Sequence, residues 1–212
     1  GADLRLEHVT SLLEDSKVQE MDSPIEPRGQ LSNGSQYGTG ALWVLSKTDL
    51  HQSDESGRLR LHAGARATAS GAIARRVPGI GDVNYDAFGV VGSTGLRWNH
   101  RSGFGAFVSL DQGFRAPNLQ ETTVLGDTGS KFEVPNAELL PEYSNAAEVG
   151  LSYRGSSVHT TVSGHATWLD GLIDEQDATW EGQSEVDGKP VVMRVNANGG
   201  FYWGASLESL WH

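Results

Sequence analysis

The sequence contains no cysteine, and this absence excludes disulfide bonds and thiolate metal sites. It also lacks any run of about 18 consecutive apolar residues, the length that a membrane-spanning helix requires. A helical membrane protein is therefore excluded. Soluble proteins and membrane β-barrels are both compatible with the sequence, because a barrel strand is apolar only at every second residue. Basic residues are a minority, and the net charge of −11 argues against a nucleic-acid partner, whose phosphates would be repelled.

The sequence is rich in a hydrophobic period of two. Between Arg58 and Ser70, Leu or Ala occupies every second position, and three arginines and a histidine lie among the alternate positions. Successive side chains of a strand point to opposite faces of a sheet, so this segment is predicted to be a half-buried strand. Similar alternation predicts strands around 104–110, 143–153, 158–168 and 201–211, and weaker strands at about 2–19, 37–50 and 84–98, with the final strand starting near Pro190.

Strand length and loop length both favour a membrane barrel. Most of the eight predicted strands have 13 residues or more, whereas globular strands usually have about five or six and membrane strands need roughly 9–11. Long connections alternate with short ones, as in barrels with long external loops and tight periplasmic turns. The long ones are 20–36, 71–83, 116–141 and 176–189, and the short ones are 51–57, 99–102 and 155–157. Aromatic residues also gather near strand ends, where an interfacial girdle would place them.

A more specific pattern lies between Gly113 and Tyr153. The sequence reads Gly-Phe-Arg-Ala-Pro-Asn-Leu-Gln-Glu over 113–121, Pro-Asn-Ala-Glu-Leu-Leu-Pro-Glu over 135–142 and Glu-Val-Gly-Leu over 148–151. This resembles the paired signature in the barrel domain of TonB-dependent receptors. Trp-Leu-Asp-Gly-Leu-Ile over 168–173 is similar to a later strand end of that family. Two departures are Gly204-Ala205-Ser206, where the family usually reads Gly-Val-Glu, and Leu140, where the family often has a basic residue.

The resemblance implies a receptor of the bacterial outer membrane that imports a scarce, bulky substrate, commonly an iron–siderophore complex or cobalamin. The implied fold is an antiparallel transmembrane β-barrel of about 22 strands around an N-terminal plug. Residues 1–212 are expected to be about eight meander strands of its wall, with the plug domain and the closing strands absent. The expected partners are outer-membrane lipid, the plug, the TonB energy-coupling protein and an unidentified small molecule; no cofactor is expected.

The motif residues are interpreted as structural. Pro117 lacks a backbone donor and suits the point where a strand leaves the sheet, while Pro135 and Pro141 stiffen a long loop. Arg115 is expected to pair with Glu148 in the lumen. The whole set is Phe114, Arg115, Ala116, Pro117, Asn118, Glu121, Pro135, Asn136, Leu139, Pro141, Glu142, Glu148 and Gly150.

The substrate-binding residues are unknown, and the candidates are five residues predicted to face the lumen: Arg58, Arg60, Arg66, His159 and His165. The arginines are better explained by pairing with carboxylates of neighbouring strands or of the plug. His159 and His165 are about 20 Å apart along one strand, too far to hold one metal ion, and no metal site is expected. The acidic group of Asp170, Asp174, Glu175 and Asp177 is interpreted as a solvated rim.

No catalytic residues are predicted, and the chain is not expected to be an enzyme. Gly92-Ser93-Thr94-Gly95 is not the nucleophile elbow of hydrolases, and no helix is predicted after it. Two alternatives stay open. One is a complete eight-stranded outer-membrane barrel with a structural or adhesin role, in which the first and last strands would pair. The other is a soluble all-β module that binds carbohydrate through Trp43, Trp180 and Trp203.

Overall fold

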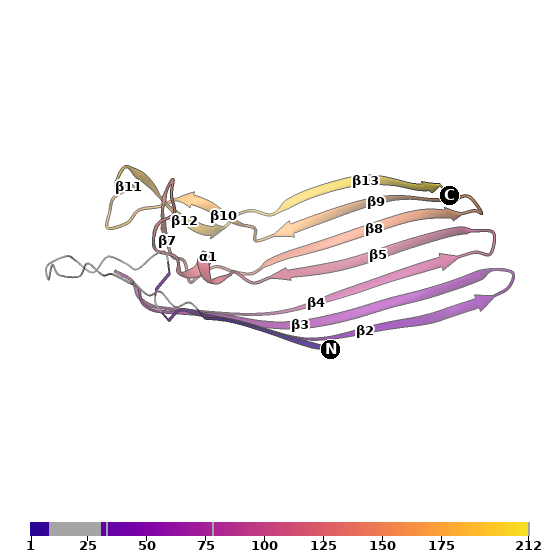
Figure 1. Cartoon of the computed structure of the whole chain (residues 1–212), viewed down its shortest axis with the longest axis horizontal. Helices are drawn as coiled ribbons and strands as arrows, with labels where there is room; N and C mark the ends of the chain where they lie inside the picture. Colours follow the sequence, from indigo (N-terminus) through magenta and orange to yellow (C-terminus); the bar gives the residue numbers. More distant parts are fainter. Residues whose placement is uncertain (9–30, 33, 78, 212) are drawn as a thin grey trace.

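The computed structural model describes residues 1–8, 31, 32, 34–77 and 79–211, which form almost exclusively β-structure (Figure 1). The long strands are β1 (Ala2–His8), β2 (Gln36–Ser53), β3 (Gly57–Val77), β4 (Gly81–Asn99), β5 (Phe104–Arg115), β8 (Glu142–Arg154), β9 (Val158–Asp170) and β13 (Gly200–Trp211). The short elements are α1 (Leu119–Thr123), β6 (Gly126–Asp127), β7 (Phe132–Val134), β10 (Ile173–Asp177), β11 (Glu185–Val186) and β12 (Lys189–Asn196). Among the described residues, no helix is long and apolar enough to cross a membrane.

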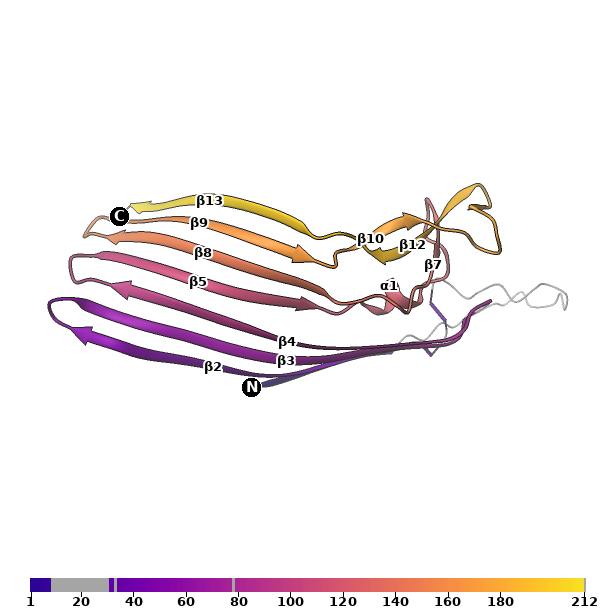
Figure 2. The same cartoon turned by 180° about the vertical axis from the view of Figure 1, so that it is seen from behind.

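The eight long strands form one curved antiparallel sheet, which we call the wall. Its order is β1-β2-β3-β4-β5-β8-β9-β13, so the long strands neighbour each other in chain order. The prediction of eight long meander strands is confirmed. β1 and β13 form the two edges, with the chain ends on opposite sides (Figure 2). Over the described residues the sheet does not close on itself, so the alternative of a closed eight-stranded barrel is wrong for this chain.

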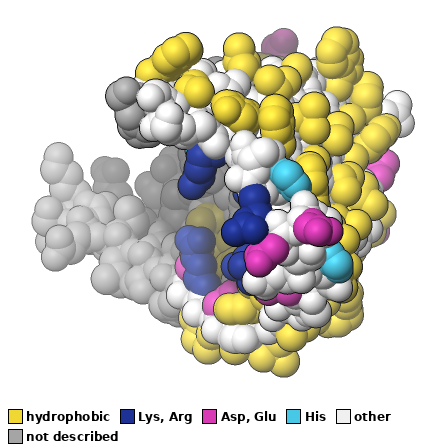
Figure 3. Space-filling view, turned by 90° about the vertical axis from the view of Figure 1, so that its right-hand side faces the viewer, with side chains coloured by type: hydrophobic (Ala, Val, Ile, Leu, Met, Phe, Trp, Pro, Cys, Tyr) yellow, Lys and Arg dark blue, Asp and Glu magenta, His cyan; other side chains and the backbone are white. Residues whose placement is uncertain are grey.

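The register sorts the wall residues into two faces of different chemistry. One cross-strand row of the outer face runs Leu61–Leu96–Val108–Val149, whereas the inner face carries Arg58, Arg60, Arg97 and Glu148 among others. Hydrophobic side chains cover the convex outside, and Lys and Arg gather in the hollow inside (Figure 3). An apolar outside and a charged inside are what a barrel wall in lipid requires.

Aromatic side chains mark two levels on the outer face. Three strands each carry a pair of exposed aromatic residues, and the two members of a pair lie ten residues apart in the sequence. The pairs are Phe88 and Trp98 on β4, Tyr143 and Tyr153 on β8, and Phe201 and Trp211 on β13. Ten residues of a strand tilted as in such barrels rise about 25 Å, the height of the apolar band. The outer-face positions between these pairs carry no charged residue. The two aromatic levels therefore define the part of the wall that lies in lipid.

Tight turns connect neighbouring strands at one end of the wall. Gly103, in the turn between β4 and β5, has φ +92°, and a Cβ there would lie 2.1 Å from the carbonyl oxygen of Arg154. Only glycine fits such a position without strain. The turns after β2, β4 and β8 are short, as the sequence predicts, and we take this end of the wall as periplasmic.

The long connections fold together at the opposite end (Figure 1). Residues 116–141 and 171–199, which we call the cap, contain α1 and the sheet of order β10-β12-β7-β6. The β7–β12 pair is parallel, unlike the rest of the cap sheet. The buried core lies here: Leu125, Val134 and Val191 of the cap pack against Ala74 and Val83 of the wall.

Three predicted boundaries are corrected. Residues 71–83 are not a long loop, because β3 continues to Val77 and β4 begins at Gly81. The final wall strand begins at Gly200, and Pro190 lies in β12 of the cap. Of the strand predicted at 2–19, β1 accounts for Ala2–His8, and residues 9–19 lie outside the described residues.

The wall has a crease between β4 and β5. The two strands pair only from Ser93 to Asn99 and from Gly105 to Asp111, after which they separate. Gln112 bridges the opening: its Oε1 accepts the backbone N–H of Gly92 at 3.2 Å, and its Nε2 donates to Asn145 at 3.0 Å. A Cβ at Gly89 would lie 2.3 Å from the ring of Phe114, so this ring covers the glycine. Beyond Asp111, β5 is therefore held to β4 by side chains and not by the backbone ladder, and it continues into the cap.

Candidate functional site

Arg115 is the centre of the junction between wall and cap. It ends β5, and its guanidinium bonds to Glu142 at the start of β8 and to both carboxylate oxygens of Glu121 in α1 at 3.0 Å. Glu142 also accepts the backbone N–H of Ile173 at 2.7 Å. The expected pairing of Arg115 with Glu148 is wrong, because the register places Glu142 opposite Arg115 and Glu148 opposite Ser109.

The rest of the first motif builds the start of α1. Asn118 caps the helix: its Oδ1 accepts the N–H of Glu121, and the Glu121 carboxylate accepts the N–H of Asn118, both at 2.9 Å. This reciprocal pair is a capping box, which satisfies two donors of the first turn. Ala116 and Pro117 follow directly after β5, and the side chain of Pro117 is fully buried. Glu121 thus stabilises the helix and holds Arg115 at the same time.

The second motif follows β7 and leads into β8. Pro135 directly follows β7, and Pro141 directly precedes β8. Leu139 is buried, and Asn136 donates from Nδ2 to the carbonyl oxygen of Arg194 at 2.8 Å. Both proline positions flank strands, in agreement with their expected place in a stiffened loop.

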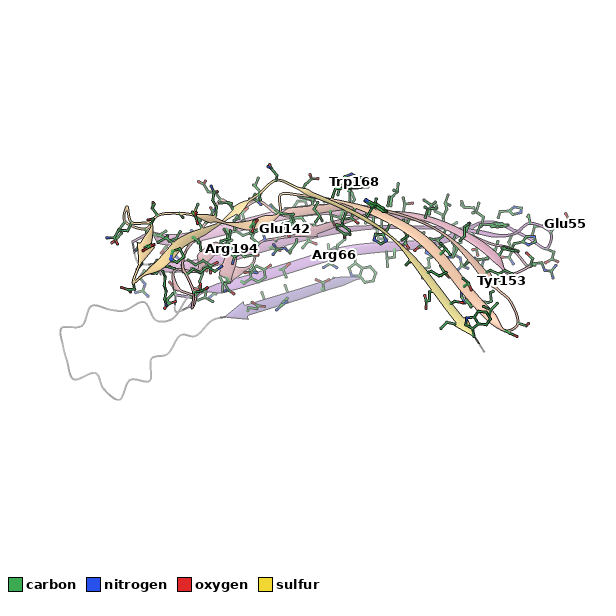
Figure 4. The ribbon with its side chains drawn as sticks, turned by 90° about the horizontal axis from the view of Figure 1, so that it is seen from above. Glu55, Arg66, Glu142, Tyr153, Trp168 and Arg194 are labelled. Atoms are coloured by element: carbon green, nitrogen blue, oxygen red, sulfur yellow. The ribbon has the colours of Figure 1, made fainter. Side chains whose placement is uncertain are left out.

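An ion-pair network joins the two segments of the cap. Arg194 on β12 donates to Glu133 on β7 at 2.8 Å and lies 3.6 Å from Glu175 on β10. Glu175 also pairs with Lys131. The side chain of Glu133 is only 3% exposed, so Arg194 compensates a carboxylate that is almost cut off from water. Glu142 and Arg194 lie at the same end of the molecule (Figure 4). Of the predicted acidic rim, Asp170, Asp174 and Asp177 are exposed, whereas Glu175 belongs to this network.

Asn196 makes a second link between the segments. Its Oδ1 accepts the N–H of Leu140 at 2.7 Å, and its Nδ2 donates to the carbonyl oxygens of Leu140 and Gly171 at 2.8 Å. A third link joins Lys189 to Asp127, and this hydrogen bond lowers the pKa of the Asp127 carboxyl below its usual value. The two loops are therefore connected by side chains as well as by the β7–β12 pair.

Gly150 has a packing role on the inner face of the wall. Its cross-strand neighbour is Phe107, and a Cβ at Gly150 would lie 2.4 Å from the phenyl ring. Arg97, next in the same row, places its guanidinium 5.3 Å from the centre of that ring. The glycine of the Glu-x-Gly motif therefore leaves room for a cation–π pair.

The three candidate arginines of the lumen face are engaged with carboxylates of neighbouring strands. Arg58 and Arg60 both bond to Asp49 on β2, and Arg66 lies 2.9 Å from Asp3 on β1. This confirms the pairing interpretation. In the described part of the chain, Arg97 and Arg154 face the same side without an ion pair.

The two candidate histidines face the inner side but are not brought together. His165 lies opposite Glu148 on β8 and Gly204 on β13, and His159 lies opposite Arg154. They belong to different levels of the wall and remain separate candidates. His159 and Arg154 line a polar hollow near the short turns, together with Arg97 and Glu208.

The three tryptophans of the carbohydrate-binding alternative do not form one surface. Trp43 shares the inner face with Arg66, Trp203 shares the outer face with Ala166, and Trp180 belongs to the cap, where it contacts Phe132. A single sugar site built from these side chains is therefore wrong.

The sequence pattern does not identify Arg194, Glu133 and Asn196 as site residues. The signal for Arg194 and Asn196 is weak, because the pattern predicts a last wall strand that starts near Pro190 and includes both residues. Glu133 shows no sign of burial in the sequence, since only the folded cap covers it.

Comparison with known proteins agrees with this architecture. The model of the family described as "TonB dependent receptor-like, beta-barrel" matches residues 15–208. No curated protein sequence matches. Among solved structures, the hemophore receptor HasR of Serratia marcescens, in complex with its hemophore HasA and heme, has a TM-score of 0.71 at 15% identity, over 99% of this chain and 36% of HasR.

Two further structures are similar. The copper transporter OprC has a TM-score of 0.63 at 16% identity, over 84% of this chain and 26% of OprC. The iron transporter FrpB of Neisseria meningitidis has a TM-score of 0.62 at 14% identity, over 86% of this chain and 24% of FrpB. At such identities the likeness shows the fold alone. The chain spans about a third of the length of HasR and about a quarter of the lengths of OprC and FrpB. With the family match over nearly its whole length, the chain belongs to the TonB-dependent receptors of the bacterial outer membrane and forms part of their β-barrel.

Proposed function

We propose that the protein imports a scarce, bulky substrate of the iron–siderophore or cobalamin type across the outer membrane, with energy from the TonB system. The proposal rests on one observation: the wall has an apolar and a charged face, and the cap packs on the charged, inner side. The wall separates lipid from a charged interior, and the cap lies at its long-loop end on the inner side, where Ala74 and Val83 receive it. A surface there would meet a substrate that arrives from outside.

The similar structures support transport of metals or metal complexes. HasR binds a hemophore and heme, OprC is a copper transporter and FrpB is an iron transporter. On this proposal a plug domain and the TonB protein are partners of the whole receptor. The wall residues discussed above have structural roles, and no catalytic residue is assigned. Arg97, Arg154, His159 and His165 are the inner-face groups that we propose for contact with a passing substrate or with the plug.

The test is uptake by cells that lack the gene. Under iron or cobalamin depletion, uptake of radioiron-labelled siderophores and of labelled cobalamin is compared between the deletion strain and the strain that carries the gene. We expect one substrate to lose its uptake in the deletion strain and equally in a strain without TonB. A matched control is the gene carrying Leu61→Arg, which should not assemble and should not restore uptake. Unchanged uptake of every substrate tested would contradict the proposal.

A further inference from the structure

A groove lies on the outer face of the wall beside the short turns. Its volume is about 810 Å³, and it is lined on the outer face by Trp98, Phe104, Ala106, Leu151, Tyr153 and Val162. Glu55 and Tyr153 mark this end of the molecule in Figure 4. The groove therefore opens toward the membrane at its periplasmic boundary, and not toward the lumen.

Ala106 forms the floor of the groove. Its cross-strand neighbours are Trp98 on β4 and Leu151 on β8, whose larger side chains are 37% and 65% exposed. Adjacent strands are about 4.8 Å apart, so the two flanking strands are separated by about 10 Å. One alanine between two large side chains leaves a channel for a single hydrocarbon chain.

The sides of the groove are held in place by hydrogen bonds and ring contacts. Trp98 donates from its indole N–H to the carbonyl oxygen of Ser56 at 2.8 Å, and the His100 ring bonds to the carbonyl oxygen of Glu55 at 2.9 Å. The rings of Phe104 and Tyr153 lie 4.9 Å apart on the other side. A groove with such fixed sides loses little conformational entropy when a ligand enters.

Five polar residues line the groove: Ser152 and Thr160 on β8 and β9, and Ser56, His100 and Ser102 at the turn end. Arg101, between the last two, has a side chain that is 67% exposed. The guanidinium lies 3.5 Å from the Asp54 carboxylate and donates to the Asp54 carbonyl oxygen at 3.2 Å. Both contacts are solvent-exposed, so they hold the guanidinium weakly. The Ser102 hydroxyl bonds to the His100 ring and the Ser56 hydroxyl to the His51 ring, both at 2.7 Å, so the exposed guanidinium of Arg101 is the group that suits a phosphate. The apolar channel beyond it suits an acyl chain.

We propose that this groove binds one phospholipid of the periplasmic leaflet, with an acyl chain over Ala106 and the phosphate at Arg101. The site differs from ordinary lipid contact in its fixed shape and in its polar end. The proposal depends on the outer-membrane location of the wall and is independent of which substrate the receptor transports.

Native mass spectrometry of the full receptor, extracted from outer membranes in a mild non-ionic detergent, tests the proposal. We expect one phospholipid to stay bound to the wild type. Ala106→Phe fills the channel and should lose it, whereas Ala147→Phe, on the same outer face but outside the groove, should keep it. Equal retention in the two variants, or lipopolysaccharide in place of phospholipid, would overturn the proposal.

A second measurement covers the case in which Ala106→Phe does not assemble. The delipidated receptor is titrated with phosphatidylglycerol and with diacylglycerol, which lacks the phosphate. Arg101→Gln lies in an exposed turn and leaves the wall intact. We expect it to weaken phosphatidylglycerol binding about tenfold, as for the loss of one charge-assisted hydrogen bond, and to leave diacylglycerol binding unchanged. Equal affinity of wild type and Arg101→Gln for phosphatidylglycerol would exclude the phosphate site.

Discussion

Leu61 and His62 are neighbours in β3 with opposite surroundings. Leu61 lies in an uncharged outer row with Leu96 and Val108, whereas His62 lies opposite Lys47 on the inner face. A charge at mid-membrane on the lipid side costs about 2–4 kcal/mol. We expect Leu61→Arg to block assembly and His62→Arg to be tolerated, as measured by the amount of folded receptor in outer-membrane fractions. Equal tolerance of both would contradict the assignment of the two faces.

Gly150 offers a test of inner-face packing. In Gly150→Val the new side chain meets the Phe107 ring and forces it away from Arg97. Overpacking of this kind costs about 1–3 kcal/mol. We expect a lower midpoint of urea unfolding in lipid vesicles. Gly164→Ala is the matched control, because the nearest atom to its new Cβ is 3.9 Å away, and its midpoint should change little.

Part of the junction between wall and cap could be predicted from the sequence. The capping residues Asn118 and Glu121 and the prolines stand in a recognisable order, so a structural role could be predicted for them. The partner of Arg115 could not. A loop of more than twenty residues separates β5 from β8, and only the folded register decides that Glu142 and not Glu148 lies opposite.

Among the elements, the cap is expected to lose most stability when Arg194 is substituted. In Arg194→Ala the buried carboxylate of Glu133 loses its partner, and breaking such a pair costs about 3–5 kcal/mol. We expect faster hydrogen exchange in β7, β10 and β12 with unchanged exchange in β8 and β9. Lys189→Ala is the control, because its partner Asp127 is largely exposed and such pairs contribute about 0–1 kcal/mol. Similar exchange in both variants would show that the network does not hold the cap.

The wall strands could be predicted because one face contacts lipid and the other a polar interior. Apolar and polar residues therefore alternate along each strand. That contrast ends where the cap begins. Ala72 and Ala74 on the inner face are buried against the cap, so the segment 71–77 alternates poorly and its sequence predicts a loop. The cap sheet itself depends on pairing between distant short segments, and strands of two to eight residues leave no periodic signal.

At the scale of the whole molecule, the family and the membrane barrel could be inferred from the motif and from the length of the alternating strands. The curvature could not, nor the inward position of the cap, since both arise from contacts between strands far apart in sequence. The same limit applies to Trp43, Trp180 and Trp203, which composition alone would group together and the fold distributes over three surfaces.

The crease between β4 and β5 has a mechanical consequence. When the wall is stretched in the membrane plane, the load passes from strand to strand through the cross-strand hydrogen bonds. Among the strand pairs of the wall from β2 to β13 these hydrogen bonds are fewest between β4 and β5, which pair only over Ser93–Asn99, and the side chain of Gln112 makes the next contact. A pulling force should therefore part β4 from β5 first, and the buried contacts of the cap with Ala74 and Val83 should then hold β1–β4 and β5–β13 together.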